Sequence, residues 1–377
     1  MLFDLTPKED RRDFFDRERE IESVKSLSSP ITLVLGLRRT GKSLSSPITL
    51  VLGLRRTGKS SVLRIALNEL GLPSIYVDLR KFEDRAYIPY KDFLLEVEKE
   101  VRKLTKRFPS LFDFLRGIKG VNVAGNGITF NWGKKDRLNF GDLLEALNDW
   151  AEERVVVAFD EAQDLINLRG ADLLNPLAYA FDNLRKVKVV MSGSEMRLLY
   201  RFLGVDNPKS PLFGRAMNEV ELKPFTREES VEFLRRGFEE AKVEFKEHER
   251  AYEELGGIPG WLTYFGYYYV NTRDFDESVR RTIRRAKELV LEEFENFLSK
   301  RPIARGRYLA IMRKVAEGCS RWSEIKRALE LHEGREINDS EVYNYINSLM
   351  ESSWIAKDEE KEVYCPAEKL IARAFKD

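Results

Sequence analysis

The chain has 377 residues, of which 34% are Asp, Glu, Lys or Arg, and its formal net charge at pH 7 is +1. This length allows two or three domains with a sizeable core, and the balanced charge gives no general attraction to nucleic acid or membranes. The N-terminus is too charged for a signal peptide, and no run of 18 apolar residues occurs. We therefore expect a cytoplasmic protein without membrane contact.

Cysteine and histidine are scarce in this chain. Cys319 and Cys365 are the only cysteines, they lie far apart without the spacing of a zinc site, and only two histidines are present. These numbers fit a reduced cytosol, where disulfides are rare. We therefore expect neither a disulfide framework nor a metal cluster.

The first predicted element is a helix over residues 17–25, and a repeat follows it. Residues 26–42 read SLSSPITLVLGLRRTGK, and residues 43–59 repeat this string without a substitution. Each copy, completed by the next serine, has the pattern G-x-x-x-x-G-K-S, which is typical of a loop that binds the phosphates of a nucleoside triphosphate. The key positions are Gly36, Gly41, Lys42 and Ser43 in the first copy, and Gly53, Gly58, Lys59 and Ser60 in the second.

Only the second copy is followed by a segment that can form the helix of a phosphate site. Residues 48–52 predict an apolar strand, and residues 60–70 predict a helix that ends at Gly71. After the first copy comes Pro47, which the interior of a helix does not easily contain. We therefore predict that the second loop is the working site and that the first is not.

In the second loop each residue type has a chemical task. The glycines let the backbone approach the anion, and the first amides of the helix point at the phosphates. Lys59 is expected to reach the β- and γ-phosphates, and Ser60 is expected to help hold Mg²⁺. Thr57 and Ser61, which stand within two residues of Lys59, complete the predicted nucleotide-binding residues of the loop.

The repeat allows two folded arrangements. In one, residues 26–42 loop out before the true strand and the site survives, at a modest cost in closure entropy. In the other, residues 31–35 take the place of that strand in the sheet, and the second copy enters the nucleotide pocket and silences it. We favour the first arrangement and interpret the repeat as a recent in-frame duplication.

Further along the chain, apolar strands alternate with amphipathic helices, and two acids end one of the strands. The predicted elements are a strand over 74–79, a helix over 90–104, a hairpin over 121–132, a helix over 140–152 and a strand over 155–159. Asp160 and Glu161 follow the last strand directly. At the carboxyl edge of a parallel sheet, Asp160 would hold Mg²⁺ through water, and Glu161 would polarise the attacking water.

The strand predicted over residues 187–191 is followed by two serines, Ser192 and Ser194. In ATPases whose sheet has a strand between the phosphate-loop strand and the acid strand, a polar residue at this place contacts the γ-phosphate or water. A cap at the start of a helix over residues 195–202 is an equally good interpretation of either serine. The sequence leaves both interpretations open.

The second half of the chain is mainly helical. Thr226 and Glu229 form a capping box for a helix that runs to about residue 240, and helices fill residues 247–300. A stripe of arginines in this region has acids one turn away, which favours a solvated salt-bridge face over phosphate binding. The stripe consists of Arg280, Arg281, Arg284 and Arg285.

From residue 302 on, the pattern predicts a winged helix. The predicted helices cover 306–317, 323–331 and 340–352, and the predicted strands cover 354–357 and 362–365. The third helix, where the residues that read DNA bases should lie, has no Lys or Arg and contains Glu341 and Glu351. A protein partner or plain packing is therefore at least as good an interpretation as DNA binding.

Together these residues resemble the archaeal ATPase family within the signal-transducing ATPases that carry several domains, relatives of the AAA+ and origin-recognition proteins. Besides the phosphate loop, the resemblance rests on FDRE at 15–18, FDEAQ at 159–163, SGSE at 192–195, PLFGR at 211–215, LKPF at 222–225 and GGIPG at 256–260. It implies an α/β fold in which a parallel P-loop sheet has helices on both faces (residues 1–224). An all-helical lid (225–300) and a winged helix (301–377) would follow.

The resemblance also implies roles for three residues outside the loop. Arg17 is similar to a residue that lies near the adenine in the family, and Pro259 belongs to a G-x-P element that packs the lid against the nucleotide. Arg215 would sense the γ-phosphate, in its own chain or from a neighbouring subunit of a homo-oligomer.

The sequence and the resemblance together predict an ATPase that works as a nucleotide-operated switch. The expected cofactors are ATP and Mg²⁺, and the expected partners are the nucleotide and either a protein or DNA at the winged helix. Two alternatives remain. One is an ATPase silenced by its repeated loop, and the other is a DNA-binding regulator in which ATP sets the conformation.

Overall fold

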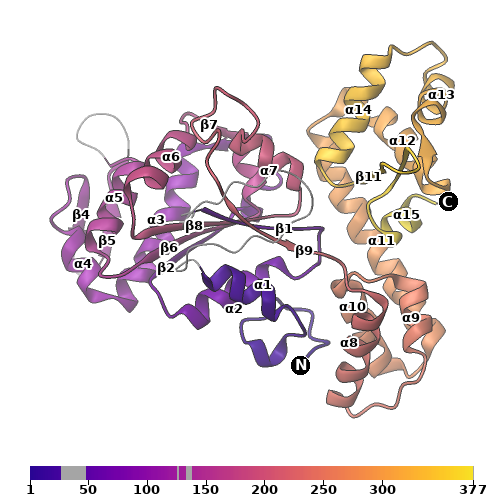
Figure 1. The fold of residues 1–377 in the computed structure, drawn as a ribbon, viewed down its shortest axis with the longest axis horizontal. Coiled ribbons are helices and arrows are strands. Elements are labelled where there is room, and N and C mark those ends of the chain that lie inside the picture. Colours follow the sequence, from indigo (N-terminus) through magenta and orange to yellow (C-terminus); the bar gives the residue numbers. More distant parts are fainter. Residues whose placement is uncertain (27–47, 125–126, 133–137, 377) are drawn as a thin grey trace.

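The computed structural model describes residues 1–26, 48–124, 127–132 and 138–376. The residues of the first loop copy named above, Gly36, Gly41, Lys42 and Ser43, lie outside these ranges. The described chain places a sheet flanked by helices on one side of the molecule and two helical lobes on the other (Figure 1).

Five parallel strands form the central sheet in the order β2-β6-β8-β1-β9. They are β1 (Ile48–Gly53), β2 (Ser74–Asp78), β6 (Val155–Asp160), β8 (Val187–Gly193) and β9 (Asn218–Leu222). Three of them, β1, β6 and β8, are buried along their whole length, as continuous apolar strands are in a sheet covered on both faces. The predicted α/β fold with a parallel sheet is confirmed.

Helices cover both faces of the sheet, and each strand divides its side chains between them. On β1, Ile48, Leu50 and Leu52 join the core with α3 to α7, whereas Val51 packs with α1 and α2. Figure 1 shows α1 and α2 below the sheet and α3, α5 and α6 above it. The helices are α1 (Glu18–Lys25), α2 (Lys59–Leu70), α3 (Tyr90–Arg107), α4 (Pro109–Leu115), α5 (Phe140–Trp150), α6 (Leu174–Asn183) and α7 (Met196–Leu203).

The second copy of the repeat supplies β1 and the helix after it. β1 lies between β8 and β9, with Leu50 opposite Met191 on one side and Glu219 on the other. α2 begins at Lys59 and ends before Gly71, whose φ of +64° is typical of a helix stop. This place in the sheet is occupied by β1 of the second copy, while residues 31–35 lie outside the described residues.

Short elements surround the sheet. β3 (Ile88–Pro89) pairs with β7 (Leu168–Arg169), and β4 (Val121–Ala124) pairs with β5 (Gly127–Phe130) in the hairpin that the sequence predicts. Single 3-10 turns are η1 (Arg11–Asp13), η3 (Leu79–Phe82), η4 (Ala162–Asn167) and η5 (Pro302–Ala304). Two of them matter below, because η3 and η4 follow directly after β2 and β6 at the carboxyl edge of the sheet.

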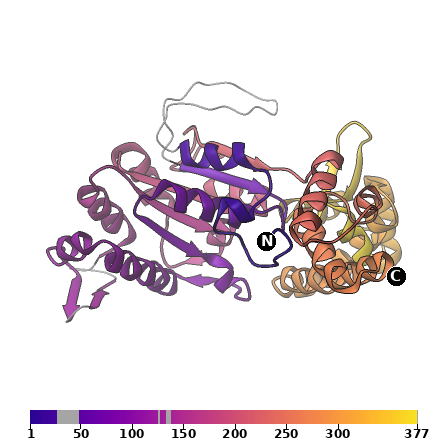
Figure 2. The same cartoon turned by 90° about the horizontal axis from the view of Figure 1, so that it is seen from below.

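The helical part of the chain follows β9 and contains two groups of helices. The first is α8 (Arg227–Glu240), α9 (His248–Leu255), α10 (Pro259–Thr272) and α11 (Phe275–Ser299), and the second is α12 (Arg305–Glu317), α13 (Trp322–Glu333), α14 (Asp339–Glu351) and α15 (Lys369–Phe375) with β10 (Ser320–Arg321), β11 (Ile355–Asp358) and β12 (Val363–Pro366). One hydrophobic cluster joins the groups, since Phe294 of α11 packs against Trp354 and Phe375. Both lobes lie beside the sheet (Figure 2). No helix of the described residues is long and apolar enough to cross a membrane.

Two local predictions for these helices are confirmed. Thr226 and Glu229 form the capping box of α8. Arg280 and Arg281 pair with Glu277 on α11, and Arg285 pairs with Glu288. The arginine stripe is therefore a salt-bridge face.

The winged helix contains a disulfide that the sequence analysis excluded. Cys319 and Cys365 are bonded although 46 residues separate them. The cause is the antiparallel pairing of β10 with β12, which sets Ser320 opposite Tyr364 and so brings the flanking cysteines together. The expectation of a chain without a disulfide is therefore wrong.

Candidate nucleotide-binding and catalytic site

The loop between β1 and α2 requires its two glycines. Gly53 has a φ of +152° and Gly58 a φ of +97°, conformations that other residues rarely adopt. A Cβ on Gly53 would lie 2.5 Å from the carbonyl oxygen of Leu222, and one on Gly58 would lie 3.1 Å from the Phe14 ring. No side chain of the described residues caps the start of α2, so its first amides can receive an anion.

Lys59 and Thr57 are held by the loop itself. Lys59 Nζ donates a hydrogen bond to the Leu54 carbonyl oxygen at 2.7 Å, and Thr57 Oγ1 donates to the same oxygen at 2.8 Å. Both side chains are buried. Burial lowers the pKa of Lys59, and the nearby carboxylates of Glu161 and Asp160 oppose this effect. The lysine therefore lies within electrostatic reach of the two acids that end β6.

Asp160 ends β6 as a fully buried carboxylate. The Tyr76 hydroxyl donates to its Oδ2 at 2.5 Å, and the Ser192 hydroxyl donates to its Oδ1. The guanidinium of Arg80 lies 3.6 Å from Oδ2. A buried polar group is costly unless it is hydrogen-bonded, and these two hydroxyls and the nearby guanidinium compensate the burial of Asp160.

Glu161, the residue after β6, has a φ of +53°. Its carboxylate accepts hydrogen bonds from neutral donors. Its Oε2 accepts hydrogen bonds from Ser194 Oγ at 2.6 Å, from the Ser194 amide at 3.2 Å and from Gln163 Nε2 at 2.8 Å. Burial alone raises the pKa of Glu161, but the cations Lys59 and Arg55 and these hydrogen bonds outweigh it and lower the pKa. The side chain is therefore ionised and fixed in orientation.

The structure bears on one of the two interpretations of the serines after β8, the one in which they cap a helix. The residue that precedes α7 is Glu195, and no side chain of the described residues caps that helix. Ser192 instead bonds Asp160, and Ser194 bonds Glu161. The capping interpretation is wrong for both serines, whereas contact with a γ-phosphate stays a prediction.

Lys59 and Glu161 border a cavity of about 420 Å³, whereas Asp160, Ser192 and Ser194 lie outside its lining. Loop residues Thr57 to Ser61 form its floor together with Arg80 and Glu161, and the opposite walls come from the N-terminal segment and from α10. A cavity of this size suits a small-molecule ligand. Ser60 and Ser61, which the sequence predicts as ligand-binding residues, both line it.

Arg17 and Pro259 also line the cavity, and their roles toward a nucleotide stay predictions. Arg17 is buried before α1, where its guanidinium donates to Glu20 at 3.0 Å and lies over the Phe225 ring. Pro259 begins α10, and the amide of the next residue, Gly260, donates to the Arg56 carbonyl oxygen at 3.1 Å. The start of α10 therefore packs directly against the loop between β1 and α2.

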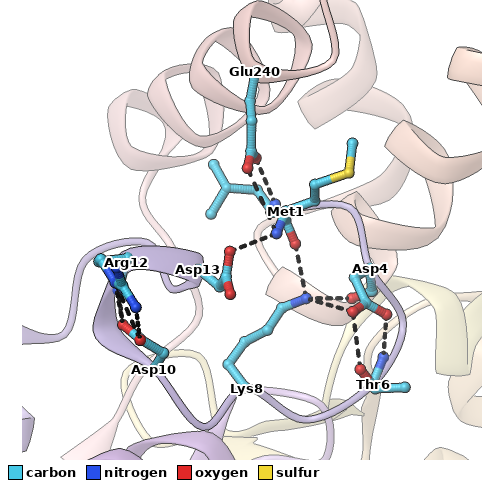
Figure 3. Close-up of polar contacts among 9 residues, drawn as sticks. Met1, Asp4, Thr6, Lys8, Asp10, Arg12, Asp13 and Glu240 are labelled. Carbon is cyan, nitrogen blue, oxygen red and sulfur yellow. Dashed lines mark hydrogen bonds and ion pairs between the residues drawn. The ribbon is translucent and has the colours of Figure 1, made fainter.

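The N-terminal segment ties the same lid to α2. The backbone amide of Lys8 donates to Ser61 Oγ at 3.0 Å. The ammonium group of Met1 pairs with Asp13 at 2.6 Å and with Glu240 of α8 at 3.5 Å (Figure 3). Ser61 is thus held from outside the loop, and the cavity is bounded by three separate parts of the chain.

Comparison with known proteins agrees with this geometry. A family model described as the ATPase domain predominantly from Archaea matches residues 14–265. The chain belongs to this archaeal ATPase family. A second model, the MCM protein C-terminal winged helix-turn-helix domain, matches residues 302–367.

Solved structures of two archaeal proteins are similar to this chain in fold. The Walker-type ATPase of Pyrococcus abyssi is 35% identical, covers 100% of this chain and 99% of its own, and superposes with a TM-score of 0.80. The ORC2 protein of Aeropyrum pernix shares the fold at 12% identity, with 99% and 96% of the two chains covered and a TM-score of 0.54. Comparison with curated proteins gives no match.

Within this member of the archaeal ATPase family, Arg215 lies far from the phosphate loop. It precedes β9, whose first residue Asn218 is level with Thr49, whereas the loop begins at Gly53 beside Leu222. Its guanidinium pairs with Asp182 at 2.6 Å. Because Arg215 stands at the amino edge of the sheet, a role as γ-phosphate sensor in its own chain is wrong. A role from a neighbouring subunit stays a prediction.

Several residues of the site were missed by the sequence analysis. Arg55 and Arg56 fill variable positions of the loop pattern, and Arg80 and Tyr76 belong to β2 and the turn after it. Gln163 stands in the FDEAQ motif, which was the one signal available for it. The others become visible only through the register of β2 with β6, which sets Asp78 opposite Asp160.

The donors around Ser60 and Asp160 fit Mg²⁺. Among the described residues no group of three or more His, Cys, Asp or Glu could form a protein cage for a metal. Mg²⁺ in nucleotide sites needs no such cage, because it takes one or two protein oxygens and fills its shell with phosphates and waters. Ser60 lines the cavity and offers a hydroxyl, whereas Asp160, a buried carboxylate at the end of β6 that does not line the cavity, would act on the metal through water.

Proposed function

We propose that this protein binds and hydrolyses ATP with Mg²⁺ and works as a nucleotide-operated switch. The observation that carries the proposal is the convergence of Lys59, Asp160 and Glu161. The lysine comes from the loop after β1 and the acids come from the end of β6, with β8 between the two strands. Separate parts of the chain thus bring a phosphate-binding cation and two oriented carboxylates to one edge of the sheet.

The residues divide the chemistry among them. The first amides of α2 and Lys59 would bind the β- and γ-phosphates, and Ser60 and Asp160 would hold the metal. When bound, Mg²⁺ supplies positive charge to the phosphate oxygens. Glu161 is ionised and would orient the attacking water and accept its proton, while Ser194 fixes the direction of the carboxylate.

Contacts of the phosphate loop support the switch. Arg56 bonds Glu293 of α11 and lies 4.4 Å over the ring of Trp261 in α10. Arg55 reaches the same Glu293 at 3.6 Å. Trp261 in turn donates to Glu368 beside α15 at 3.1 Å. A movement of the loop on nucleotide binding would therefore act directly on the lid and the winged helix.

The winged helix contacts Ser194, the residue whose hydroxyl holds Glu161. The Ser353 hydroxyl donates to the Ser194 carbonyl oxygen at 3.0 Å, and Arg201 of α7 pairs with Glu351 of α14 at 2.8 Å. One end of the helix that reads DNA in other winged helices is thus packed on the ATPase core. These contacts favour a packing and protein-binding role for this domain over a role as DNA-binding regulator.

The proposal is tested by ATP hydrolysis in the 377-residue chain and in a version that lacks residues 26–42, each with and without Lys59→Ala. We expect equal hydrolysis in the two parents and loss of about 10²–10³-fold with Lys59→Ala. Lys246→Ala, which removes an exposed lysine paired with Glu244, is the matched control and should leave the rate unchanged.

The outcomes separate the alternatives. Hydrolysis only in the shortened version would mean that the repeat silences the site. Absence of hydrolysis and of an ATP-induced rise in thermal stability in both versions would overturn the proposal. A shift in stability without hydrolysis would mean that the protein binds nucleotide but does not turn it over.

A further inference from the structure

Arg80 stands where β2 leaves the sheet, beside Asp160 and the cavity. Asp78, the last residue of β2, is opposite Asp160 in the parallel pairing of β2 with β6. Arg80 follows two residues later in η3, and one guanidinium nitrogen lies 3.6 Å from Asp160 Oδ2. The same side chain lines the cavity together with Lys59, Ser60 and Glu161.

A clamp holds this arginine in place. Asp78 accepts hydrogen bonds from Arg80 Nε at 2.9 Å and from a terminal nitrogen at 2.5 Å, so both carboxylate oxygens are used. The Arg80 amide also donates to Asp78 at 3.1 Å, which fixes the backbone of the turn. A bidentate pair of this kind orients a guanidinium as well as binding it. Arg80 is still 41% exposed on its side chain, so it can meet a ligand in the cavity.

The charge balance in the cavity indicates that a bound triphosphate needs a further cation, and Arg80 is placed to provide it. A triphosphate carries more negative charge than one Mg²⁺ and Lys59 neutralise, and Asp160 and Glu161 add two carboxylates to the same region. Like Arg80, which pairs with Asp78, the other cations that line the cavity in the described chain have partners, and Lys8 bonds the carbonyl oxygens of Met1 and Asp4. Arg56 bonds Glu293, and Arg17 bonds Glu20. Arg80 differs from them because its guanidinium lies 3.6 Å from Asp160.

We propose that Arg80 contacts the γ-phosphate of the bound nucleotide within its own chain and stabilises the charge that develops there during hydrolysis. The inference rests on the proposed ATPase function and deepens it. It assigns to Arg80 the task that the family resemblance gave to Arg215, which stands at the opposite edge of the sheet. Asp78 is the positioning residue that aims the guanidinium.

The test compares Arg80→Ala and Arg80→Lys with the parent chain in hydrolysis and in affinity for ATP and ADP. We expect kcat to fall about 10²–10³-fold in Arg80→Ala. ATP affinity should fall at least about tenfold while ADP affinity stays within about twofold, because only ATP has the γ-phosphate. Arg80→Lys should recover part of the ATP preference, since it keeps a charge but loses the bidentate clamp.

The matched control is Arg85→Ala. Arg85 follows the same turn, and its substitution removes the same charge as Arg80→Ala. Because Arg85 pairs with Asp92 on the surface, the affinities for ATP and ADP and the kcat should equal those of the parent. Excess Mg²⁺ should not restore Arg80→Ala, because the proposed partner is a phosphate and not the metal ligand Asp160.

Three results would overturn the inference. One is parental kcat and ATP preference in Arg80→Ala while Lys59→Ala is inactive, which leaves the proposed function intact. Another is an equal loss of ATP and ADP affinity in both Arg80 variants, which indicates a merely structural role. The third is a parent chain that neither binds nor hydrolyses ATP, in which case the proposed function and this inference fail together.

Discussion

The nucleotide cavity and the winged helix are both rich in charge, yet they use it in opposite ways. In the winged helix, two central cations have acids beside them: Arg307 lies between Glu333 and Glu341, and Lys326 pairs with Asp339. In the cavity, Lys59 bonds a backbone carbonyl and Glu161 is held by neutral donors. Exposed pairs satisfy each other and contribute little, whereas charges held by neutral groups are kept for a ligand.

The substitution Glu161→Gln gives the strongest test of whether the charges in the cavity act on a ligand. The amide keeps the size of the side chain but cannot accept a proton from water, so we expect ATP hydrolysis to fall about 10²–10³-fold, or about 3–4 kcal/mol. ATP binding should survive, because the phosphates are held by the loop. Steady-state hydrolysis and ATP titration measure the two effects separately.

An exposed acid provides the control for Glu161. Glu244→Gln removes an acid that pairs only with Lys246 on the surface of the lid, and its hydrolysis should match the parent. Hydrolysis at the parental rate by Glu161→Gln would show that another group activates the water, and would sink the assignment of this acid.

Much of the nucleotide end could be predicted from sequence because its signals are local. The glycines, Lys59 and Ser60 lie in one loop, and Asp160 and Glu161 follow an apolar strand directly. The structure adds what depends on register. Arg80 looks like an ordinary loop arginine until β2 pairs with β6.

For Arg215, the direction of the strand shows where a motif predicted from the sequence lies in the fold. A residue that precedes a strand of a parallel sheet stands at the amino edge, away from the ligand site at the carboxyl edge. Arg215 comes three residues before β9, so its chain position alone argued against a role in its own site. The resemblance gave a motif, whereas the strand direction decided where that motif lies.

In the winged helix, the helices could be predicted from the sequence, whereas the disulfide between Cys319 and Cys365 could not. The three helices show apolar periodicity, and all three form close to the predicted residues. The disulfide depends on β10, a strand of two residues that no pattern indicates. Two cysteines 46 residues apart become neighbours only after that strand has paired.

Removal of the disulfide is the second way to sharpen the comparison. The Cys319→Ser and Cys365→Ser double variant should lose about 2–4 kcal/mol of stability, because a bond across a loop of this length restricts the unfolded chain. The measurement is denaturant unfolding of the parent and the variant in oxidising and reducing buffer. Only the parent should respond to reductant.

A thiol count gives an independent check on this bond. The denatured, unreduced parent should contain no reactive thiol, since its two cysteines are bonded. Two reactive thiols per chain would contradict the disulfide. Because neither cysteine lines the nucleotide cavity, ATP affinity should be the same in the parent and in the double variant.

The smallest expected effect lies where the two regions meet, at Glu293. This acid on α11 receives Arg56 directly and Arg55 at 3.6 Å, so it joins the phosphate loop to the helix that carries the winged helix. In Glu293→Gln, we expect ATP to protect α10 and α11 less against hydrogen exchange. A double-mutant cycle with Arg56→Gln should give a coupling of about 1 kcal/mol.

Glu295→Gln is the matched control on the same helix, because Glu295 pairs with Arg305 and contacts neither loop arginine among the contacts of the described chain. If Glu293→Gln and Glu295→Gln respond alike to ATP, the loop does not act on the lid through this acid. If ATP-induced protection of α10 and α11 falls only in Glu293→Gln, then Glu293 couples the phosphate loop to the helix that carries the winged helix. Nucleotide binding would then be sensed by the winged helix through the same loop that holds the phosphates.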